Sequence, residues 1–400
     1  MKEGWTYKKI KEVCTSITDG DWIEKKDQSQ SGIRLIQTGN IGVGKFIPKD
    51  DSHRYISEDT FNRLKCTEIF EGDILISRLP NPLGRSCILP KLDTKCITAV
   101  DCSILRTKRD ELLPKFFVYY TQSQGYFSKI NAESSGTTRA RITRKKLEET
   151  TIPTPSISVQ QRIVERLDAA FENIDKLKAN AEKQLAEAQT LFQKSLAKAM
   201  EPKEGWEEKT LKETCSVITD GTHHSPVNLA TGKYKYITAK NIKPWGLDLS
   251  NITFVTEDVH KEIVSRCCPL KGDVLYIKDG ATTGIAIVNP LDEEFSMLSS
   301  VALIRPKKDI LLSEFLCYAL NSPLIYEQTR SQMDGAAITR VTLVKIKGFR
   351  IPIPSISEQQ RIVERLDALS ENIRKYEEIQ RQIISECDAL KQALLRKVFE

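Results

Sequence analysis

The chain has 400 residues, of which 40% are hydrophobic and 28% charged, and its formal net charge is +6. This length exceeds one ordinary domain, and the composition is typical of a soluble globular protein with two or three domains. No apolar run approaches the roughly 20 residues that span a bilayer, and the first residues lack the apolar core of a signal peptide. These features argue against a membrane or secreted protein and predict a cytoplasmic one.

The ten cysteines are scattered without a CxxC pair, which predicts reduced thiols rather than disulfides or a zinc site. Charge is uneven along the chain: residues 1–150 carry 26 Lys and Arg against 20 Asp and Glu, whereas residues 201–350 carry 19 of each. A mild basic excess permits nucleic-acid binding without requiring it. Any nucleic-acid contact in the second half must therefore come from local clusters.

The sequence contains an internal repeat with a period of about 200 residues. Between Ile152–Ile174 and Ile351–Ile373, 19 of 23 positions are identical. Upstream, the halves share only short matching segments. This indicates two domains with the same fold but different side chains. The matching segments are Ile17–Gly20 and Ile218–Gly221 (ITDG in both), Asn40-Ile41 and Asn241-Ile242, Gly72-Asp73 and Gly272-Asp273, Gly84 and Gly284, Arg106 and Arg305, and Gly136 and Gly335.

Within each half, short apolar runs separated by turn residues predict strands, and one or two helices follow them. This order lacks the regular βαβ rhythm of a parallel sheet and predicts a mixed α/β (α+β) domain. The predicted strands are 34–38, 73–77, 87–89 and 100–106 in the first half, and 235–238, 273–277, 285–288 and 300–305 in the second. The predicted helical regions are 114–130 and 312–330.

Each half ends in a long predicted helix of about 40 residues. Prolines mark its start, and Ser158–Gln161 and Ser357–Gln360 have the spacing of capping boxes. Apolar residues then recur every three or four positions, as in a coiled coil, with Gln184 and Gln380 as polar interruptions. This seam comprises Ile163, Leu167, Ala170, Ile174, Leu177, Ala181, Ala188 and Leu191, and Ile362, Leu366, Leu369, Ile373, Tyr376, Ile383, Cys387, Leu390 and Leu394.

The connection between the halves sets the expected topology. Only Glu201–Glu204 link the first helix to the second domain, so the second helix must run back antiparallel to bury its seam on the first. The sequence therefore predicts two globular domains joined by two antiparallel helices, with an internal pseudo-two-fold repeat. The predicted boundaries are 1–151 and 201–350 for the domains, and 152–200 and 351–400 for the helices.

The helix starts agree more closely than a coiled-coil seam requires, because exposed polar positions recur as well. A recent gene duplication is one explanation, although it leaves open why the domains diverged and the helix starts did not. The other is that both helix starts bind the same partner while the domains bind different targets. The predicted partner-binding residues are Gln160, Arg162, Glu165, Arg166, Gln359, Arg361, Glu364 and Arg365.

Three motifs are specific: the helix start IPxPS-xx-QQRIVERLD, which occurs twice, the two ITDG stretches, and the hairpin GDVLYIKDGATTG. With these motifs, the whole chain resembles the specificity subunits of type I restriction–modification enzymes. The resemblance implies two target-recognition domains that each read half of a bipartite DNA sequence, and helices that set the gap between the half-sites. It also implies docking of two methyltransferase subunits and association of restriction/translocase subunits. Catalysis and the cofactors S-adenosylmethionine, ATP and Mg²⁺ would then belong to those partners.

Several loops offer side chains that suit DNA. The hairpin Lys278–Gly284 has a cation, hydroxyls and pliable backbone, and Arg78–Arg85 is its counterpart with different content. The run Thr137–Lys146 has five cations and no acid. Ordinary turns and a solvated charge run remain alternatives. The candidate DNA contacts are Thr38, Asn40, Arg78, Arg85, Arg139, Arg141, Arg144, Lys145, Thr219, Thr222, His223, Lys240, Asn241, Lys278, Thr282, Thr283 and Arg340.

Catalytic motifs are missing or incomplete. Gly39–Lys45 imitates the phosphate loop GxxxxGK, but Phe46 follows where a hydroxyl must hold magnesium. No GxSxG or HExxH motif is present, and the four histidines do not suggest a general-base constellation. We therefore expect a chain without catalytic activity of its own. The alternative to DNA reading is a scaffold that carries two interaction domains on a helical rod and binds no nucleic acid.

Overall fold

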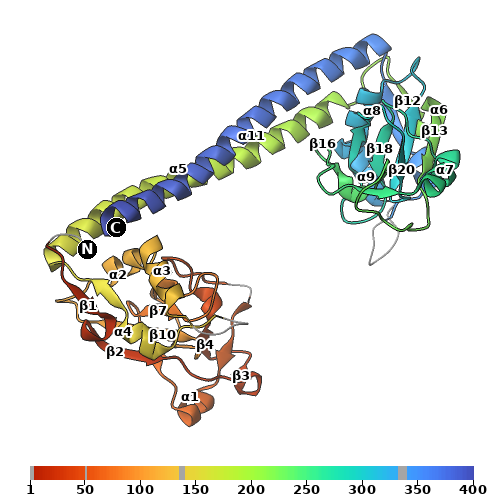
Figure 1. Cartoon of the computed structure of the whole chain (residues 1–400). Coiled ribbons are helices and arrows are strands. Elements are labelled where there is room, and N and C mark those ends of the chain that lie inside the picture. The colour runs from red at the N-terminus through yellow and green to blue at the C-terminus, as the bar shows by residue number, and fades with distance from the viewer. Residues whose placement is uncertain (1–3, 50–51, 135–139, 332–339) are drawn as a thin grey trace. The chain divides into compact units, whose positions relative to one another are not determined.

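A computed structural model describes residues 4–49, 52–134, 140–331 and 340–400 of the chain (Figure 1). The chain divides into two compact units, one formed by Met1–Glu182 with Arg381–Glu400 and the other by Lys183–Gln380. The long helices α5 (Ile157–Ala199) and α11 (Ile356–Phe399) each contribute to both units. We describe each unit by itself.

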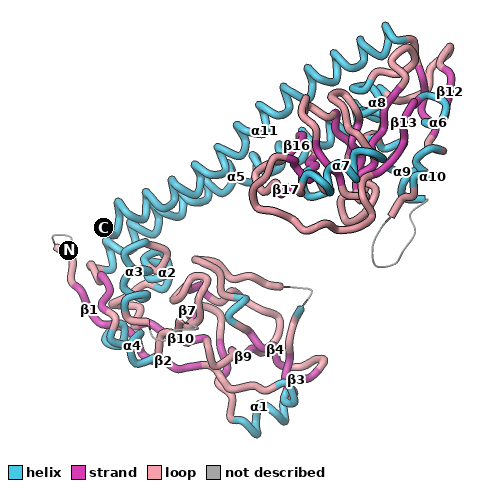
Figure 2. Tube along the Cα trace, turned by 45° about the vertical axis from the view of Figure 1, so that its right-hand side comes forward, coloured by secondary structure: helices cyan, strands magenta, loops and turns pink. Residues whose placement is uncertain are grey.

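The first unit contains short strands connected by long loops, with helices following the strands (Figures 1 and 2). Its strands are β1 (Tyr7–Lys9), β2 (Cys14–Asp19), β3 (Gln28–Ser29), β4 (Ile33–Ile36), β5 (Tyr55–Ile56), β6 (Glu68–Ile69), β7 (Ile74–Ser77), β8 (Ser86–Ile88), β9 (Cys96–Thr98), β10 (Cys102–Thr107) and β11 (Thr151–Pro153). Its shorter helices are α1 (Glu58–Leu64), α2 (Pro114–Tyr120), α3 (Gln124–Ala132) and α4 (Arg144–Glu149).

Two sheets organise this domain. A four-stranded antiparallel sheet has the order β2-β10-β7-β8, and a five-stranded sheet has the order β3-β5-β4-β9-β6. Strand β7 reads Ile-Leu-Ile-Ser and is buried along its whole length, because β10 and β8 flank it. Strand β1 pairs with β11, which fastens the start of the domain to the segment that leads into α5.

The second unit repeats this plan. Its four-stranded sheet has the order β13-β21-β18-β19, matching the first unit strand for strand, while its second sheet is reduced to β17-β14-β20 and the pair β15-β16. Its strands are β12 (Glu207–Thr210), β13 (Cys215–Asp220), β14 (Tyr234–Ile237), β15 (Ile242–Lys243), β16 (Gly246–Leu247), β17 (Thr253–Val255), β18 (Val274–Ile277), β19 (Ala286–Val288), β20 (Phe295–Met297), β21 (Val301–Pro306) and β22 (Arg350–Ile353). Its shorter helices are α6 (Leu211–Thr214), α7 (Glu257–Arg266), α8 (Ser313–Leu320), α9 (Pro323–Ser331) and α10 (Leu343–Lys347).

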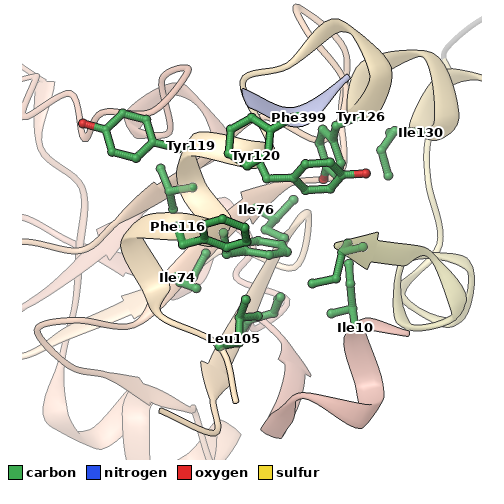
Figure 3. Close-up of a cluster of buried hydrophobic side chains, with 14 of the residues drawn as sticks. Ile10, Ile74, Ile76, Leu105, Phe116, Tyr119, Tyr120, Tyr126, Ile130 and Phe399 are labelled. Carbon is green, nitrogen blue, oxygen red and sulfur yellow. The ribbon is translucent and has the colours of Figure 1, made fainter. Parts of the chain in front are cut away.

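The main core of the first unit lies between its four-stranded sheet and the helices. Figure 3 shows Phe116, Tyr120 and Tyr126 packed over the strand residue Ile76, with Phe399 from the end of α11 beside them. The second unit has the equivalent arrangement, with Leu196 of α5 packed into the core that contains Phe315. The C-terminal end of each long helix therefore completes the core of a domain.

The long helices pack against each other antiparallel within each unit. In the first unit, Lys178 of α5 pairs with Asp388 of α11 at 2.7 Å, and Asp175 pairs with Lys391 further along. In the second, the Tyr376 hydroxyl donates to Gln184 Oε1 at 3.0 Å. As the residue numbers rise along α5, the numbers of the contacting residues on α11 fall. The two helices are therefore antiparallel, which confirms the prediction.

The eight predicted strands agree with the structure to within two residues at each boundary, and the other strands of each unit were not predicted. The four-stranded sheets are antiparallel, consistent with the missing βαβ rhythm. The helix starts require a correction. Strand β11 occupies 151–153, so α5 begins at Ile157 rather than at 152, and Ser158 lies inside the first turn instead of capping it. In the second copy the cap contact comes from Ser355, whose Oγ accepts from the Glu358 N–H at 3.4 Å.

The predicted seam is too wide. Leu167, Ile174, Ala181, Leu366 and Cys387 are buried as expected. However, about half of the side-chain surface remains exposed at several predicted seam positions, because a pair of helices covers only one stripe on each member. These positions are Leu177, Leu191, Tyr376 and Leu390.

Candidate nucleic-acid interface

Three loops meet at one end of the four-stranded sheet in each unit. They follow β2 and β7 and precede α4 in the first unit, and they follow β13 and β18 and precede α10 in the second. The central strand β10 pairs with both β2 and β7, which brings the first two loops together. The third is attached by a main-chain hydrogen bond, from Ile142 N–H to the Arg78 carbonyl at 3.3 Å and from Val341 N–H to the Lys278 carbonyl at 2.9 Å. We call this arrangement the three-loop site: residues 19–22, 78–85 and 140–146 in one unit, and 220–223, 278–284 and 340–343 in the other.

The repeated ITDG stretch builds the floor of this site. A Cβ atom on Gly20 would lie 2.3 Å from the Thr98 carbonyl oxygen, and one on Gly221 would lie 1.9 Å from that of Met297. The chain therefore crosses the turn before β10 or β21 too closely for any side chain. The glycine recurs because of this backbone approach, so the motif is explained by the fold.

The aspartate of the same motif pairs with a buried cation. In the first unit Asp19 Oδ1 lies 3.5 Å from Arg78 Nε, and in the second Asp220 Oδ2 lies 3.4 Å from Lys278 Nζ. Arg78 is only 5% exposed and Lys278 only 1%. Both were expected to contact DNA, and this expectation is corrected: each side chain lies under the loops, where a neighbouring carboxylate offsets the cost of its burial.

Arg85 is a second buried cation, and it holds the hairpin loop in shape. Its Nη1 donates to the carbonyls of Leu79, Pro80 and Pro82, each at 3.0 Å. Its Nε and Nη2 donate to the carbonyls of Ile41 at 2.6 Å and Thr38 at 2.8 Å. Burial lowers the pKa of its guanidinium. With its donors taken up by main-chain oxygens, Arg85 is unsuited to contact a phosphate, contrary to the prediction.

Three further candidates are also buried and occupied. Asn40 Oδ1 accepts from Gln37 N–H at 2.9 Å and its Nδ2 donates to the Ile47 carbonyl at 2.9 Å, which closes the loop after β4. Asn241 makes the equivalent contacts after β14. The Thr283 hydroxyl donates to the Gly280 carbonyl at 2.7 Å. Asn40, Asn241 and Thr283 therefore shape loops and do not present base-reading groups.

The other candidates lie at the surface or partly so, and one falls outside the described residues. Arg141 and Arg340 are exposed and occupy equivalent places in the three-loop sites, each beside a carboxylate. His223 is exposed and contacts Arg266 and Asp220. The remaining exposed candidates are Arg144, Lys145, Lys240 and Thr282; Thr38, Thr219 and Thr222 are half-buried; Arg139 lies outside the described residues.

Two exposed tryptophans were missed by the sequence reasoning. Trp22 is 69% exposed and lies two residues after Gly20, at the place that His223 holds in the second unit. Trp245 is 77% exposed in the turn between β15 and β16. A tryptophan in a polar loop was the available signal, because tryptophan is enriched at interfaces.

The starts of the long helices form a second candidate surface. Gln160 and Gln359 are fully buried: each Oε1 accepts a main-chain N–H, from Leu113 or Leu312, at 2.9 Å. They fasten the helix to its domain and cannot bind a partner, which corrects that prediction. The other predicted residues are exposed and make no ion pair within the described part of the chain: Arg162, Glu165, Arg166, Arg361, Glu364 and Arg365.

The first unit also contains a groove of about 1000 Å³ between the turn at 43–46, α2 and the long helices. Its central charges are neutralised internally, Asp168 by Lys115 and Asp388 by Lys178, each at 2.7 Å. We assign no ligand to it. Among the described residues, no three His, Cys, Asp or Glu side chains gather as a metal site would require, and no described helix could cross a membrane.

Comparison with known proteins gives one consistent match. The family model of the type I restriction modification DNA specificity domain matches twice, over residues 2–187 and 203–384. The EcoBI specificity subunit of Escherichia coli is 24% identical over 321 residues, covering 74% of this chain and 67% of that protein. The StySPI specificity subunit of Salmonella potsdam is 23% identical and covers 100% of this chain and 89% of that protein.

Two solved structures share the fold. A chain from work on complex assembly and conformational transition of the type I R-M system has a TM-score of 0.78 and 21% identity, with 100% of this chain and 98% of that chain covered. The HsdS subunit from Thermoanaerobacter tengcongensis has a TM-score of 0.57 and 20% identity, with 100% and 97% covered.

Proposed function

Because this chain belongs to the type I restriction–modification DNA specificity family, we propose that it is the subunit that reads the DNA sequence in such an enzyme. Each three-loop site reads one half of a bipartite target. The observation that carries this assignment is that the two sites share an aspartate–cation ion pair beneath their loops but differ in the side chains exposed above it. Asp19 and Asp220 recur beneath the loops, whereas the exposed positions above them differ, with Trp22 in one unit and His223 in the other.

The chemistry of the exposed loops suits DNA. Arg141, Arg144 and Lys145 form a cationic group beside the first hairpin, and Arg340 with Thr282 lies beside the second. Arginine and lysine supply the phosphate contacts that position a protein on a duplex. Arginine, histidine and hydroxyl side chains can also hydrogen-bond base edges in the major groove. We propose that binding is therefore steeply salt-dependent and that the two units differ in the bases they accept.

We further propose that this subunit acts without chemistry of its own, in the cytoplasm, within a larger assembly. Two methyltransferase subunits dock on the repeated helix starts, restriction/translocase subunits join them, and the paired helices set the gap between half-sites. S-adenosylmethionine, ATP and Mg²⁺ then bind to those partners. Support comes from the equivalent exposed charges at the two helix starts. No feature of the fold or of the comparisons favours a scaffold that binds no nucleic acid.

The test is to co-express the chain with its methyltransferase partner and to map methylated bases in a host genome with and without the gene. We expect one split recognition sequence, methylated only when the gene is present. The purified complex should shift a duplex that carries this sequence at salt concentrations where an unrelated duplex is released. A methylation pattern that does not depend on the gene, together with no duplex preference, would contradict the proposed function.

The two docking sites make a separate prediction about stoichiometry. Arg162→Glu should remove one of two bound methyltransferase subunits, and the double variant Arg162→Glu with Arg361→Glu should remove both, because a reversed charge at a polar interface weakens binding by roughly tenfold or more. Native mass spectrometry counts the bound subunits. Lys194→Glu, on the same helix beyond the repeated stretch, is the matched control and should keep two. Two partners on the double variant would rule out this surface.

A further inference from the structure

An exposed arginine faces a carboxylate in both three-loop sites, but the carboxylate comes from a different loop in each. In the first unit Arg141 Nη2 lies 2.7 Å from Asp101 Oδ1, in the turn before β10. In the second, Arg340 Nε lies 3.3 Å from Asp279 Oδ1, in the hairpin loop after β18. Each arginine directly precedes the residue whose N–H attaches the third loop to the hairpin, Ile142 or Val341. The two arginines therefore occupy equivalent positions in the two sites.

The positions of the two aspartates are not equivalent. Arg78 N–H donates to the Asp101 carbonyl at 2.9 Å, and Lys278 N–H donates to the Ser300 carbonyl at 2.9 Å, so Ser300 stands where the first unit has Asp101. Asp279 directly follows Lys278, and the residue that follows Arg78 is Leu79. The arginine–carboxylate pair has therefore been retained while its acidic member moved from one loop to another. Shared ancestry of the two halves does not by itself produce this exchange.

Both units thus contain a row of alternating charges that includes a buried cation and ends in an exposed arginine. It comprises Asp19, Arg78, Asp101 and Arg141 in the first unit, where Arg78 meets Asp101 through the main chain, and Asp220, Lys278, Asp279 and Arg340 in the second, where each neighbouring pair is an ion pair. The outermost arginine is about half exposed in each unit. An ion pair at this level of exposure contributes little to folding, typically about 0–1 kcal/mol, so stability is a weak reason to rebuild it.

The carboxylates are also incompletely satisfied. Asp101 Oδ1 and Asp279 Oδ1 are shielded from solvent, yet neither accepts a hydrogen bond of good geometry within the described residues, although each lies close to its arginine. Each pair is therefore held by charge more than by aligned hydrogen bonds, so a phosphate or base edge that offers better alignment can compete for the arginine.

Resting on the DNA-reading function proposed above, we infer that Asp101 and Asp279 hold Arg141 and Arg340 back from DNA of the wrong sequence. On an unrelated duplex, binding depends on phosphate contacts alone, and the carboxylate competes with phosphate for the arginine. On the correct half-site, base contacts bring the loops closer and the arginine transfers from the carboxylate to the DNA. The pair thereby lowers non-specific affinity more than specific affinity.

The test uses the full chain in complex with its methyltransferase partner and two probes, a duplex with the mapped recognition sequence and an unrelated duplex of equal length. We expect Asp101→Asn and Asp279→Asn each to tighten binding to the unrelated duplex by about three- to fivefold. The slope of log affinity against log salt for that duplex should become steeper by about one. Affinity for the recognition sequence should change less, so discrimination falls.

Two controls separate this inference from simpler explanations. Glu172→Gln removes a paired carboxylate on α5, where Glu172 lies 2.6 Å from Lys176, and should leave both affinities unchanged. In the double variant Asp101→Asn with Arg141→Gln, the gain should disappear, because the aspartate acts through its arginine. A gain that persists in the double variant, or unchanged non-specific affinity in both single variants, overturns the inference. If the wild-type complex itself shows no sequence preference, the proposed function fails instead.

Discussion

Replacing Gln160 by alanine is expected to loosen the first domain from helix α5 and to lower its free energy of unfolding by about 3 kcal/mol or more. The Gln160 side chain is fully buried. Its Oε1 accepts from Leu113 N–H at 2.9 Å, and its Nε2 donates to the carbonyls of Glu111 and Pro155, each at 2.8 Å. Alanine would leave three main-chain groups without these partners, and each costs about 1–3 kcal/mol when it cannot reach water.

Gln161 provides a matched control, because it is the same residue type one position later and is exposed. Gln161→Ala should change stability by no more than about 0.5 kcal/mol. The second unit offers the same comparison, with Gln359 buried and Gln360 exposed. Hydrogen-exchange mass spectrometry of peptides over α2 should report faster exchange in the Gln160 variant alone. Equal exchange in both variants would mean that the buried contacts do not anchor the helix.

This comparison also marks the limit of what the sequence could predict. Gln160 and Gln161 recur together as Gln359 and Gln360, so the repeat singles out both residues without distinguishing them. Their roles differ because Leu113 and Glu111 approach the helix from a segment nearly 50 residues earlier. Turn chemistry and apolar runs, in contrast, are local, and from them four strands of each half were predicted to within two residues, while the other strands were not predicted.

In the three-loop sites, too, residue types could be predicted from the sequence but burial could not. The cations and hydroxyls of the hairpins were recognised from sequence, but which of them reach the surface depends on contacts between distant strands. Arg78 is buried because β2 and the turn before β10 close over it. Its guanidinium pairs with Asp19 and donates a hydrogen bond to the Val100 carbonyl. Lys278 is likewise buried beside Asp220, whereas Arg85 is buried among main-chain carbonyls. A sequence pattern contains the residue types but not the depth at which each one lies.

Burial of these cations has a functional consequence. The buried side chains of Arg78 and Arg85 donate to main-chain carbonyls and hold the loop backbone, so the exposed residues above them can differ without loss of the fold. Trp22 in one unit and His223 in the other illustrate such a difference at one position of the frame. Under the proposed function, variants at buried frame positions should impair binding to every sequence. Variants at exposed positions should alter the preferred half-site.

The end of helix α11 gives the second large effect. Phe399→Ala is expected to destabilise the first domain by about 3–5 kcal/mol, because it removes a buried aromatic ring and leaves a cavity. Phe399 lies edge-on to Phe116 and Tyr120, with ring centroids 5.5 and 5.6 Å apart, and 6.4 Å from Trp5. These partners belong to the first domain, although Phe399 is the penultimate residue of the chain.

Local exchange measurements distinguish this effect from general loss of structure. Peptides over α2 and α3 should exchange faster in Phe399→Ala, whereas peptides over α8 and α9 should not, since Leu196 and Met200 complete the core of the second unit. Leu390→Ala, at a half-exposed position of the same helix, is the control and should leave exchange over α2 and α3 unchanged. Because the first domain needs residues from the far end of the chain, its three-loop site depends on α11. Phe399→Ala should therefore weaken recognition of the half-site read by the first unit and spare the other. Undisturbed exchange over α2 and α3 would show that the helix end is dispensable to that core.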